Sequence, residues 1–282
     1  MKGLGLVLEG GGSRGVYTAG VLQFLMEKNI YLPYVIGVSA GACNGSSYIS
    51  RQLERNKRVT IDYVSHPEYL SFRNYLKKRQ LFGMDFIFDT LPNELVPFDF
   101  ETFNKAVEEF VVGVTDCKTG EPLFYRKSTY ADDMLTLLRA SSSLPLVAPV
   151  VNFDNRVLMD GGISAPIPIK QSIEDGNPKN IVVLTRNRGY YKKPATAHWY
   201  IRRKYRHYPG LLEAIDRRHQ VYNQTLNELF EEEKKGNVFI ICPTEKLMVG
   251  RIEKNKNKLL HLYNRGYEDV KSISDSLNEF IS

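Results

Sequence analysis

The chain has 282 residues, of which 43% are hydrophobic and 25% are charged, and it carries a net charge of +6 at pH 7. This composition is typical of a soluble globular protein with a sizeable core, and no apolar run approaches the ~18 residues that a membrane span needs. The mild positive charge permits an anionic partner, such as a phospholipid surface or a nucleic acid, without requiring one.

The N-terminal residues and the cysteines indicate in which cellular compartment the protein is expected. An apolar run over residues 3–8 stops at Glu9, which is too short for a signal peptide, so we expect a buried strand and a cytoplasmic protein. Cys43, Cys117 and Cys242 are isolated and lack the CxxC or Cys/His spacing of a metal site. We therefore predict reduced thiols, with neither a disulfide framework nor a bound metal.

Strand and helix patterns alternate through the first half of the chain. After the strand at 3–8, helical spacing of apolar residues covers 16–28, a second apolar strand covers 34–38, and a second helix runs from about 40 to 53. Strands that are joined by helices through short connections run parallel, with right-handed crossovers. The pattern predicts a three-layer α/β/α fold with a mainly parallel central sheet.

The second half adds further strands to this sheet. Short apolar runs that are bounded by turn residues predict hairpins and single strands. We expect hairpins over 110–126 and 150–159 (the latter turning at Asp154-Asn155), a helix over 131–140, strands over 181–185 and 238–241, and helices in the last thirty residues.

A glycine-rich loop, Gly10-Gly11-Gly12-Ser13-Arg14-Gly15, follows the first predicted strand and opens the first helix. Its GxGxxG spacing matches the dinucleotide-binding fingerprint in form. That fingerprint also needs an acidic residue roughly 20 positions further on, and residues 30–38 contain none. The Gly-Lys-Ser/Thr ending of a P-loop is absent too, so a nucleotide site is disfavoured.

The second predicted strand ends in Gly37-Val38-Ser39-Ala40-Gly41, the GxSxG pattern of a nucleophile elbow. A serine on a sharp strand-to-helix turn exposes its hydroxyl above the sheet, and the two glycines remove side chains that would collide there. In parallel α/β folds the first two strand-to-helix loops can lie side by side, so N–H groups of the glycine loop would stabilise an oxyanion formed at Ser39. An ordinary turn of small residues is the alternative.

Two kinds of residue compete for the role of general base. None of the five histidines follows a clean strand end or lies in a glycine-containing turn, although a Ser–Asp–His triad stays open at this point. Asp160 ends an apolar strand and precedes two glycines, while Asp116 and Asp154 lie in comparable turns. The histidines are His66, His198, His207, His219 and His261.

Three motifs, in this order, resemble those of the patatin-like phospholipases: the glycine loop 10–15, the elbow 37–41 and Asp160-Gly161-Gly162. The segment 139–145, Arg-Ala-Ser-Ser-Ser-Leu-Pro, resembles the one that this family carries shortly before its Asp-Gly-Gly. The similarity covers roughly residues 3–185.

The resemblance implies a serine lipid acyl hydrolase that needs no cofactor and cleaves the fatty-acyl esters of phospholipids. Ser39 would attack the ester, Asp160 would carry the proton, and the glycine loop would form the oxyanion hole. Because a free aspartate has a pKa of about 3.9 and is a poor base near pH 7, the site must be partly dry. Two alternatives stay open: a general carboxylesterase for soluble esters, and a non-catalytic module that binds phosphate or lipid. The implied site comprises Ser39 and Asp160, the loop Gly10, Gly11, Gly12, Ser13, Arg14 and Gly15, the elbow glycines Gly37 and Gly41, and Gly161 and Gly162 beside the base.

Residues 186–282 carry no motif that we can assign and look like the tail of a bacterial branch of the family. Since no linker divides the chain, we predict one domain over 1–282. Cationic and aromatic residues interleave over 186–207, which fits a solvated surface helix or a membrane-interface patch that would make the protein peripheral to a membrane. Nucleic-acid binding is disfavoured because no recognised module surrounds the stretch.

Phenylalanines crowd residues 82–103. Most are expected in the core, and some are candidates for the lining of an acyl-chain groove over Ser39. They are Phe82, Phe86, Phe88, Phe98, Phe100 and Phe103.

Overall fold

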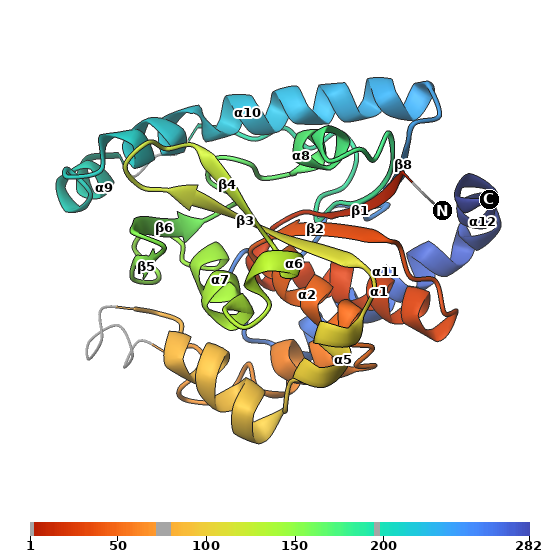
Figure 1. Ribbon diagram of the computed structural model, residues 1–282, viewed down its shortest axis with the longest axis horizontal. Coiled ribbons are helices and arrows are strands. Elements are labelled where there is room, and N and C mark those ends of the chain that lie inside the picture. The colour runs from red at the N-terminus through yellow and green to blue at the C-terminus, as the bar shows by residue number, and fades with distance from the viewer. Residues whose placement is uncertain (1–2, 72–79, 195–197) are drawn as a thin grey trace.

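The computed structural model describes residues 3–71, 80–194 and 198–282. An eight-stranded sheet, ordered β5-β6-β3-β2-β1-β7-β8 with β4 beside β3, lies between two layers of helices (Figure 1). This arrangement confirms the expected α/β/α architecture. The strands are β1 (Leu4–Leu8), β2 (Tyr34–Val38), β3 (Glu109–Asp116), β4 (Pro122–Arg126), β5 (Val151–Phe153), β6 (Arg156–Asp160), β7 (Lys179–Val183) and β8 (Val238–Ile241).

The helices connect and cover these strands. They are the 3₁₀ helix η1 (Gly12–Gly15), α1 (Val16–Glu27), α2 (Ala40–Ile49), α3 (Arg55–Lys57), the π-helices η2 (Arg58–Asp62) and η3 (Phe86–Leu95), α5 (Phe100–Lys105), α6 (Lys127–Tyr130), α7 (Met134–Ser141), α8 (Ile169–Glu174), α9 (His198–Lys204), α10 (Pro209–Lys234), α11 (Lys256–Ser272) and α12 (Ser274–Ile281). Within the described part of the chain, none is both long and apolar enough to cross a membrane.

The sheet is mainly parallel, as expected. β1 pairs in parallel with β2 and β7, β2 with β3, and β7 with β8. The two predicted hairpins are β3–β4 and β5–β6, both antiparallel, and positive φ angles at Asp154 and Asn155 form the second turn. The helix expected over 40–53 ends earlier, at Ile49, because Arg51 adopts a φ of 59° and cannot continue it.

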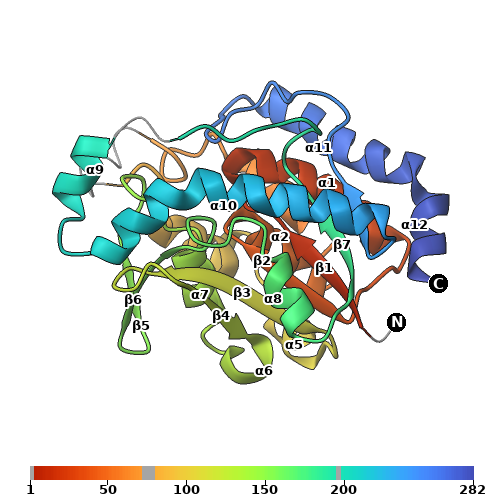
Figure 2. The same ribbon diagram turned by 90° about the horizontal axis from the view of Figure 1, so that it is seen from above.

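Alternate residues of the strands pack into separate hydrophobic clusters on the two faces of the sheet. On β1, Leu6 and Leu8 face the core that lies under α1, α2 and α11, whereas Val7 faces the core under α10. Helix α10 crosses this second face (Figure 2) and contributes an apolar stripe in which Tyr222, Leu226 and Leu229 are buried. Because successive side chains of a strand point to opposite faces of the sheet, each face has its own apolar surface, and a layer of helices covers each.

The C-terminal region packs against the N-terminal half of the chain. A Cβ on Gly20 of α1 would lie 2.0 Å from the carbonyl oxygen of Tyr263 on α11, so this close approach requires glycine. The Tyr17 hydroxyl donates to Asp269 Oδ2 at 3.0 Å across the same contact. The expected helices of the last thirty residues thus join the core of the sheet.

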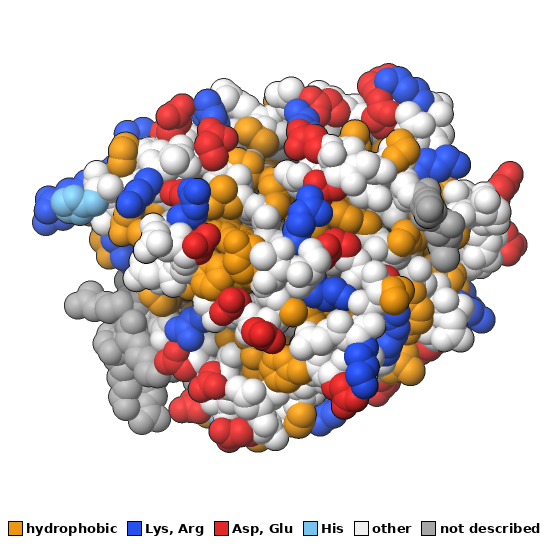
Figure 3. Space-filling view, viewed as in Figure 1, with side chains coloured by type: hydrophobic (Ala, Val, Ile, Leu, Met, Phe, Trp, Pro, Cys, Tyr) orange, Lys and Arg blue, Asp and Glu red, His pale blue; other side chains and the backbone are white. Residues whose placement is uncertain are grey.

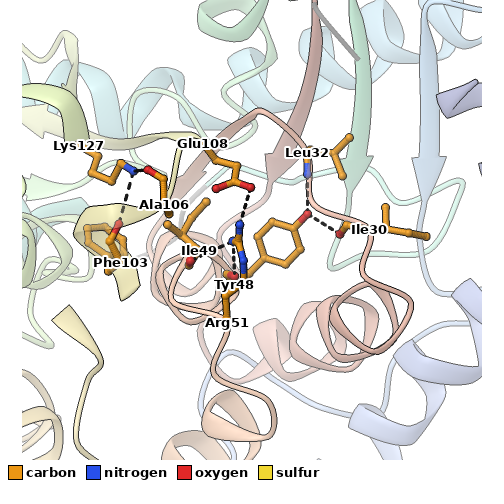
Figure 4. A network of polar contacts seen from close by, with 9 residues as sticks. All are labelled: Ile30, Leu32, Tyr48, Ile49, Arg51, Phe103, Ala106, Glu108 and Lys127. Carbon is orange, nitrogen blue, oxygen red and sulfur yellow. Dashed lines mark hydrogen bonds and ion pairs between the residues drawn. The ribbon is translucent and has the colours of Figure 1, made fainter. Parts of the chain in front are cut away.

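Polar residues also gather near the amino-terminal ends of β2 and β3 (Figure 4). The Tyr48 hydroxyl accepts the Leu32 N–H at 2.8 Å and donates to the Ile30 carbonyl at 2.7 Å. Arg51 pairs with Glu108 at 2.6 Å, and Lys127 donates to two backbone carbonyls. We call Tyr48, Arg51, Glu108 and Lys127 the amino-end cluster.

Candidate active site

Ser39 follows β2 directly and begins α2 from a strained conformation, with φ 54° and ψ −129°. A non-glycine residue at positive φ is uncommon and marks a constrained turn. A Cβ on Gly41 would lie 2.4 Å from the Leu8 carbonyl oxygen, and one on Gly37 would lie 2.7 Å from the Ala42 nitrogen. Both elbow glycines are therefore required by close backbone approach.

A second serine holds this turn. The N–H of Ser39 donates to Ser141 Oγ at 2.8 Å, and Ser141 Oγ donates to the Gly113 carbonyl at 2.6 Å. Ser141 is fully buried at the end of α7, so it ties the elbow to β3. This role of Ser141 was not predicted, and its place within segment 139–145 is the one signal in the sequence that points to it.

Strand β3 brings Asp160 beside Ser39. Because β4 pairs with β3 along 111–115, β2 and β6 must share the other edge of β3. On that edge Val38 pairs with Gly113, and Asp160 pairs with the next residue, Val114. The end of β2 therefore meets the end of β6, and Ser39 and Asp160 line the same cavity.

The Asp160 carboxyl is buried and only half engaged. Oδ1 accepts the N–H of Gly162 at 2.8 Å, whereas Oδ2 has no partner with full hydrogen-bond geometry among the described residues. Burial raises the pKa of Asp160 above its usual range. The Arg218 guanidinium and the Ser39 hydroxyl oppose that rise in pKa because both favour the charged carboxylate.

The glycine loop also lines the cavity of Ser39. Some of its backbone N–H groups have acceptors within the protein and others do not. The N–H of Ser13 donates to the Arg251 carbonyl at 2.9 Å, and that of Arg14 donates to the Gly11 carbonyl at 3.3 Å. Those of Gly11 and Gly12 have no acceptor among the described residues. Gly11 and Gly12 line the cavity of Ser39 and Asp160.

An apolar cavity of about 130 Å³ opens from Ser39 towards η2 and η3. Phe82 and Phe88 line it, whereas Phe86 is 5% exposed in the core and Phe100 lies at the surface with 37% of its area exposed. The phenylalanines of 82–103 thus divide between core, surface and cavity. Other apolar residues of the lining are Val16, Val59, Val64, Tyr69, Leu70, Met84 and Ile87.

The cavity that contains Ser39 and Asp160 is also lined by cationic side chains. They come from the glycine loop, from the 186–207 stretch, from α10 and from the segment between β8 and α11; they are Arg14, Arg186, Lys192, Arg218 and Arg251. No local pattern in the sequence marks Arg218 or Arg251, and neither was predicted. The stretch 186–207, expected as a surface helix or a membrane-interface patch, is divided in the structure: Arg186 and Lys192 line the cavity, while Trp199 on α9 is 74% exposed.

Other candidates for the base lie elsewhere. Asp116 pairs with Arg156 at 2.9 Å, and Asp154 forms the β5–β6 turn. His66 stacks on Phe86 with ring centroids 4.4 Å apart. Among the described residues, no histidine lines the two cavities that contain Ser39, and the His198 side chain lies outside the described part. That part of the chain also holds no group of three His, Cys, Asp or Glu residues placed to bind a metal.

Two family models match separate parts of the chain. A family model described as patatin-like phospholipase matches residues 6–173, and a model of a domain of unknown function (DUF6363) matches residues 208–282. Uncharacterized protein YjjU of Escherichia coli (strain K12) is 29% identical over 193 residues, which cover 64% of this chain and 52% of that protein. The solved structure of VipD from Legionella pneumophila covers 97% of this chain and 66% of its own, with a TM-score of 0.49 and 14% identity.

Two further relatives carry functional names. The probable lipid hydrolase 463L of Invertebrate iridescent virus 6 is 26% identical over 201 residues, 62% of this chain and 65% of that protein. Lysophospholipase nte1 of Aspergillus terreus (strain NIH 2624 / FGSC A1156) is 29% identical over 170 residues, 57% of this chain and 10% of that protein. The matched region thus spans about half the length of the bacterial relative and a tenth of the fungal one.

Proposed function

The chain belongs to the patatin-like phospholipase family, and we propose that it is a serine-dependent lipid acyl hydrolase in which Ser39 is the nucleophile and Asp160 the base. The observation that carries the proposal is the register along β3. Val38 and Asp160 pair with consecutive residues of one strand edge, so the strained elbow and the buried carboxyl meet in one cavity.

The proposed reaction uses the two oxygens of Asp160 differently. Oδ1 is held by the Gly162 N–H, and Oδ2 is free to accept the Ser39 proton as Ser39 Oγ attacks the ester carbonyl carbon. Asp160 then returns this proton to the leaving alcohol, and water hydrolyses the acyl-enzyme. Burial raises the pKa of Asp160, which brings it closer to the working pH of a general base.

We assign the oxyanion hole to the N–H groups of Gly11 and Gly12. They lie in the cavity and have no acceptor among the described residues, which is what an anionic tetrahedral intermediate requires. The N–H groups of Ser13 and Arg14 are engaged by carbonyls, so the proposed hole is narrower than the whole 10–15 loop. The bond from Ser13 to Arg251 instead fixes the loop.

The apolar cavity favours a lipid over a small soluble ester. Its lining by Phe82 and Phe88 suits an acyl chain whose ester lies at Ser39, because burial of apolar surface drives such binding. The strain at Ser39 favours an enzyme over a binding module, since residues held at rare φ and ψ angles cluster at catalytic sites.

Helix α9 is the proposed contact with a lipid surface. Trp199 and Tyr200 are exposed there beside Arg202, Arg203 and Lys204, and cationic side chains gather at this end of the molecule (Figure 3). Aromatic side chains favour the headgroup region, and cations favour anionic lipid. The cytoplasmic location expected from the sequence stays a prediction.

The test is hydrolysis of a chromogenic acyl ester by the purified chain, in parallel with Ser39→Ala and Asp160→Asn. We expect both variants to lose activity by at least about 1,000-fold because each lacks an essential group of the reaction. Ser128→Ala, at an exposed serine, and Asp154→Asn, in a turn that tolerates asparagine, are the matched controls. Full activity in folded Ser39→Ala would refute the proposal.

A further inference from the structure

We propose that the segment 249–253, between β8 and α11, is a clasp that holds the glycine loop in the shape of an oxyanion hole, with Ser13 as the positioning residue. The inference rests on the proposed function and adds a part to its catalytic machinery. The clasp lies within residues 208–282, which match a domain of unknown function, and outside the patatin-like match over 6–173.

Two hydrogen bonds in opposite directions join the clasp to Ser13. The Ser13 N–H donates to the Arg251 carbonyl at 2.9 Å, and the Ser13 hydroxyl accepts the Glu253 N–H at 3.0 Å. The clasp contributes backbone groups to both bonds, so the contact depends on the path of its chain. Ser13 and Glu253 are 240 positions apart, and the contact is therefore a product of the tertiary fold.

The clasp also restricts the loop sterically. Gly12 adopts a φ of 57°, and a Cβ at this position would lie 2.4 Å from the Arg251 carbonyl oxygen. Glycine enters such conformations readily, and it leaves them readily unless its neighbours are fixed. Because the Arg251 carbonyl lies against Gly12 and also accepts the Ser13 N–H, the peptide group between these two loop residues has little freedom to rotate.

The proposed oxyanion hole needs this support. Its donors are the N–H groups of Gly11 and Gly12, which directly precede Ser13. Glycine loses more conformational freedom on ordering than any other residue, so a loop that begins with three glycines is not rigid by itself. Oxyanion donors lower a barrier because they are in place before the charge develops, without reorganisation during the reaction.

The clasp is itself anchored to the core. Val249 is buried among the apolar residues of one face of the sheet, and after the clasp Asn255 Oδ1 accepts the Lys258 N–H at 3.1 Å and caps α11. Helix α11 lies beside α1 (Figure 2), where a Cβ on Gly266 would lie 2.1 Å from the Tyr17 carbonyl oxygen. Since α1 follows the loop directly, the C-terminal region holds both the loop and the helix that it opens.

Other contacts hold the two ends of the loop. A Cβ on Gly10 would lie 3.1 Å from the Ser39 Cβ, and Asn44 Nδ2 donates to the Gly15 carbonyl at 2.7 Å. Both contacts lie within the patatin-like match. The clasp holds Ser13 between these ends, and it comes from a different part of the chain.

The test compares Ser13→Ala with the wild type in the full chain, on a soluble acyl ester. This variant deletes the acceptor of the Glu253 N–H and keeps every backbone group of the loop. We expect kcat to fall by about 10- to 100-fold while KM stays within about 2-fold, because misplaced oxyanion donors weaken the transition state and not the bound ester. An unchanged kcat would overturn the proposal.

Two further variants serve as controls. Ser13→Thr keeps a hydroxyl at this position and should recover most of the activity that Ser13→Ala loses. Ser50→Ala deletes a buried hydroxyl that contacts Ser47 and Gln52 at the far end of α2 from Ser39, and it should leave kcat unchanged. A fall in kcat in Ser50→Ala as large as that in Ser13→Ala would show a general effect of lost hydroxyls and overturn the assignment to Ser13.

Inhibitor binding distinguishes a positioning role from a merely structural one. In an alkyl trifluoromethyl ketone the Ser39 Oγ adds to the carbonyl carbon, its proton passes to Asp160, and the carbonyl oxygen becomes an oxyanion in the hole. The matching alkyl ether binds without reacting. Ser13→Ala should weaken ketone binding by the factor by which kcat/KM falls and leave ether binding unchanged. Equal weakening of both would overturn the proposal.

A double-mutant cycle tests the hydrogen bond from the side of the clasp. Glu253→Pro removes the N–H donor, since proline has none. Each single variant should lower kcat, and Ser13→Ala/Glu253→Pro should lose no more than the larger single loss, because both remove the same bond. Additive losses would overturn the proposal. If Glu253→Pro unfolds, the ketone measurement on Ser13→Ala decides the question.

Hydrogen exchange separates this inference from the proposed function. The backbone N–H at position 13 should exchange slowly in the wild type and faster in Ser13→Ala. Slow exchange that Ser13→Ala accelerates, in a wild type that neither hydrolyses esters nor binds the ketone, would leave the contact standing and remove the hydrolase together with the catalytic role of the clasp. An active wild type, with kcat and exchange unaffected by Ser13→Ala, would leave the hydrolase standing and remove the clasp.

Discussion

Two polar clusters lie at opposite ends of the parallel strands, and they differ in how their charges are paired. In the amino-end cluster, Arg51 contacts Glu108 and backbone carbonyls, and Lys127 donates to two further carbonyls. At the carboxyl end, Arg218 and Lys192 have no hydrogen-bond partner among the described residues for their charged groups. The amino-end cations thus have direct hydrogen-bond partners, whereas Arg218 faces Asp160 without a hydrogen bond and Lys192 lies over the Tyr222 ring.

Positive φ angles occur at both ends, 54° at Ser39 and 59° at Arg51. At the carboxyl end the strained residue is the proposed nucleophile, and the Asp160 carboxyl beside it is buried with one oxygen unpartnered. Such features cost stability, about 1 to 3 kcal/mol for a residue in a rare conformation, and they persist where function needs them. The comparison therefore predicts opposite effects of substitutions at the two ends.

The largest expected effect concerns Asp160 and pH. Because burial raises the pKa of Asp160, activity should fall as the pH drops through that raised value, where the base becomes protonated. Asp160→Asn should lose at least about 1,000-fold in kcat at pH values above that raised pKa, and its activity should not depend on that titration. Rate profiles against pH on a soluble ester measure both effects.

The same group gives a stability prediction of defined sign. A carboxyl whose folded-state pKa is raised binds its proton more tightly in the folded state, so its contribution to stability declines as the pH rises from about 3.9 through the raised value. Asp160→Asn should thus be more stable than wild type at pH 7, with the difference vanishing below the ordinary aspartate pKa. A destabilised variant at pH 7 would contradict this account of the site.

The next effect is at the amino end. Arg51→Met leaves the Glu108 carboxylate, 7% exposed, without its cation, and should lower the free energy of unfolding by about 2 kcal/mol. Activity of the folded variant should be unchanged because Arg51 is remote from Ser39. Denaturant titration followed by an ester assay checks both statements, and loss of activity without loss of stability would break the comparison.

The smallest expected effect on the free energy of unfolding is that of Arg218→Met, the matching substitution at the carboxyl end. Arg218→Met removes the repulsion between Arg218 and Arg251 together with the attraction of Arg218 to Asp160 and Glu9. Because these two changes oppose each other, the free energy of unfolding should change by less than about 1 kcal/mol. The loss of Arg218 should also raise the pKa of Asp160 and move the acidic limb of the rate profile to higher pH. A fall in stability like that of Arg51→Met would show that both clusters serve the fold.

Local patterns were sufficient for much of the fold. Strand β1, helix α1, strand β2 and both hairpins were predictable, because alternation, helical spacing and turn residues act over a few neighbouring positions. The elbow at Ser39 was predictable from its short motif. A Cβ on Gly37 would meet Gly41 and Ala42 within the same turn, whereas a Cβ on Gly41 would meet the Leu8 carbonyl of the neighbouring strand β1. The end of α2 was less predictable, because no local pattern indicates that Arg51 adopts a φ of 59°.

The choice among aspartates shows what sequence alone leaves open. Asp116, Asp154 and Asp160 all lie at strand ends or turns, and a family resemblance favoured the third. In the structure, the pairing of β6 with the edge of β3 that also carries β2 brings Asp160 to Ser39. Val114 and Asp160 are 46 residues apart and Ser39 and Asp160 are 121 apart, so no local pattern encodes this arrangement.

The α/β class, the glycine loop and the serine elbow were recognisable from the chain alone, because hydrophobic periodicity and short glycine motifs are local features. The charges that surround Ser39 were not, because they depend on how distant segments pack. Lys192, Arg218 and Arg251 come from three separate segments that look like ordinary basic residues of a solvated surface. They line one cavity because the C-terminal region packs against the glycine loop, where the Ser13 N–H donates to the Arg251 carbonyl at 2.9 Å.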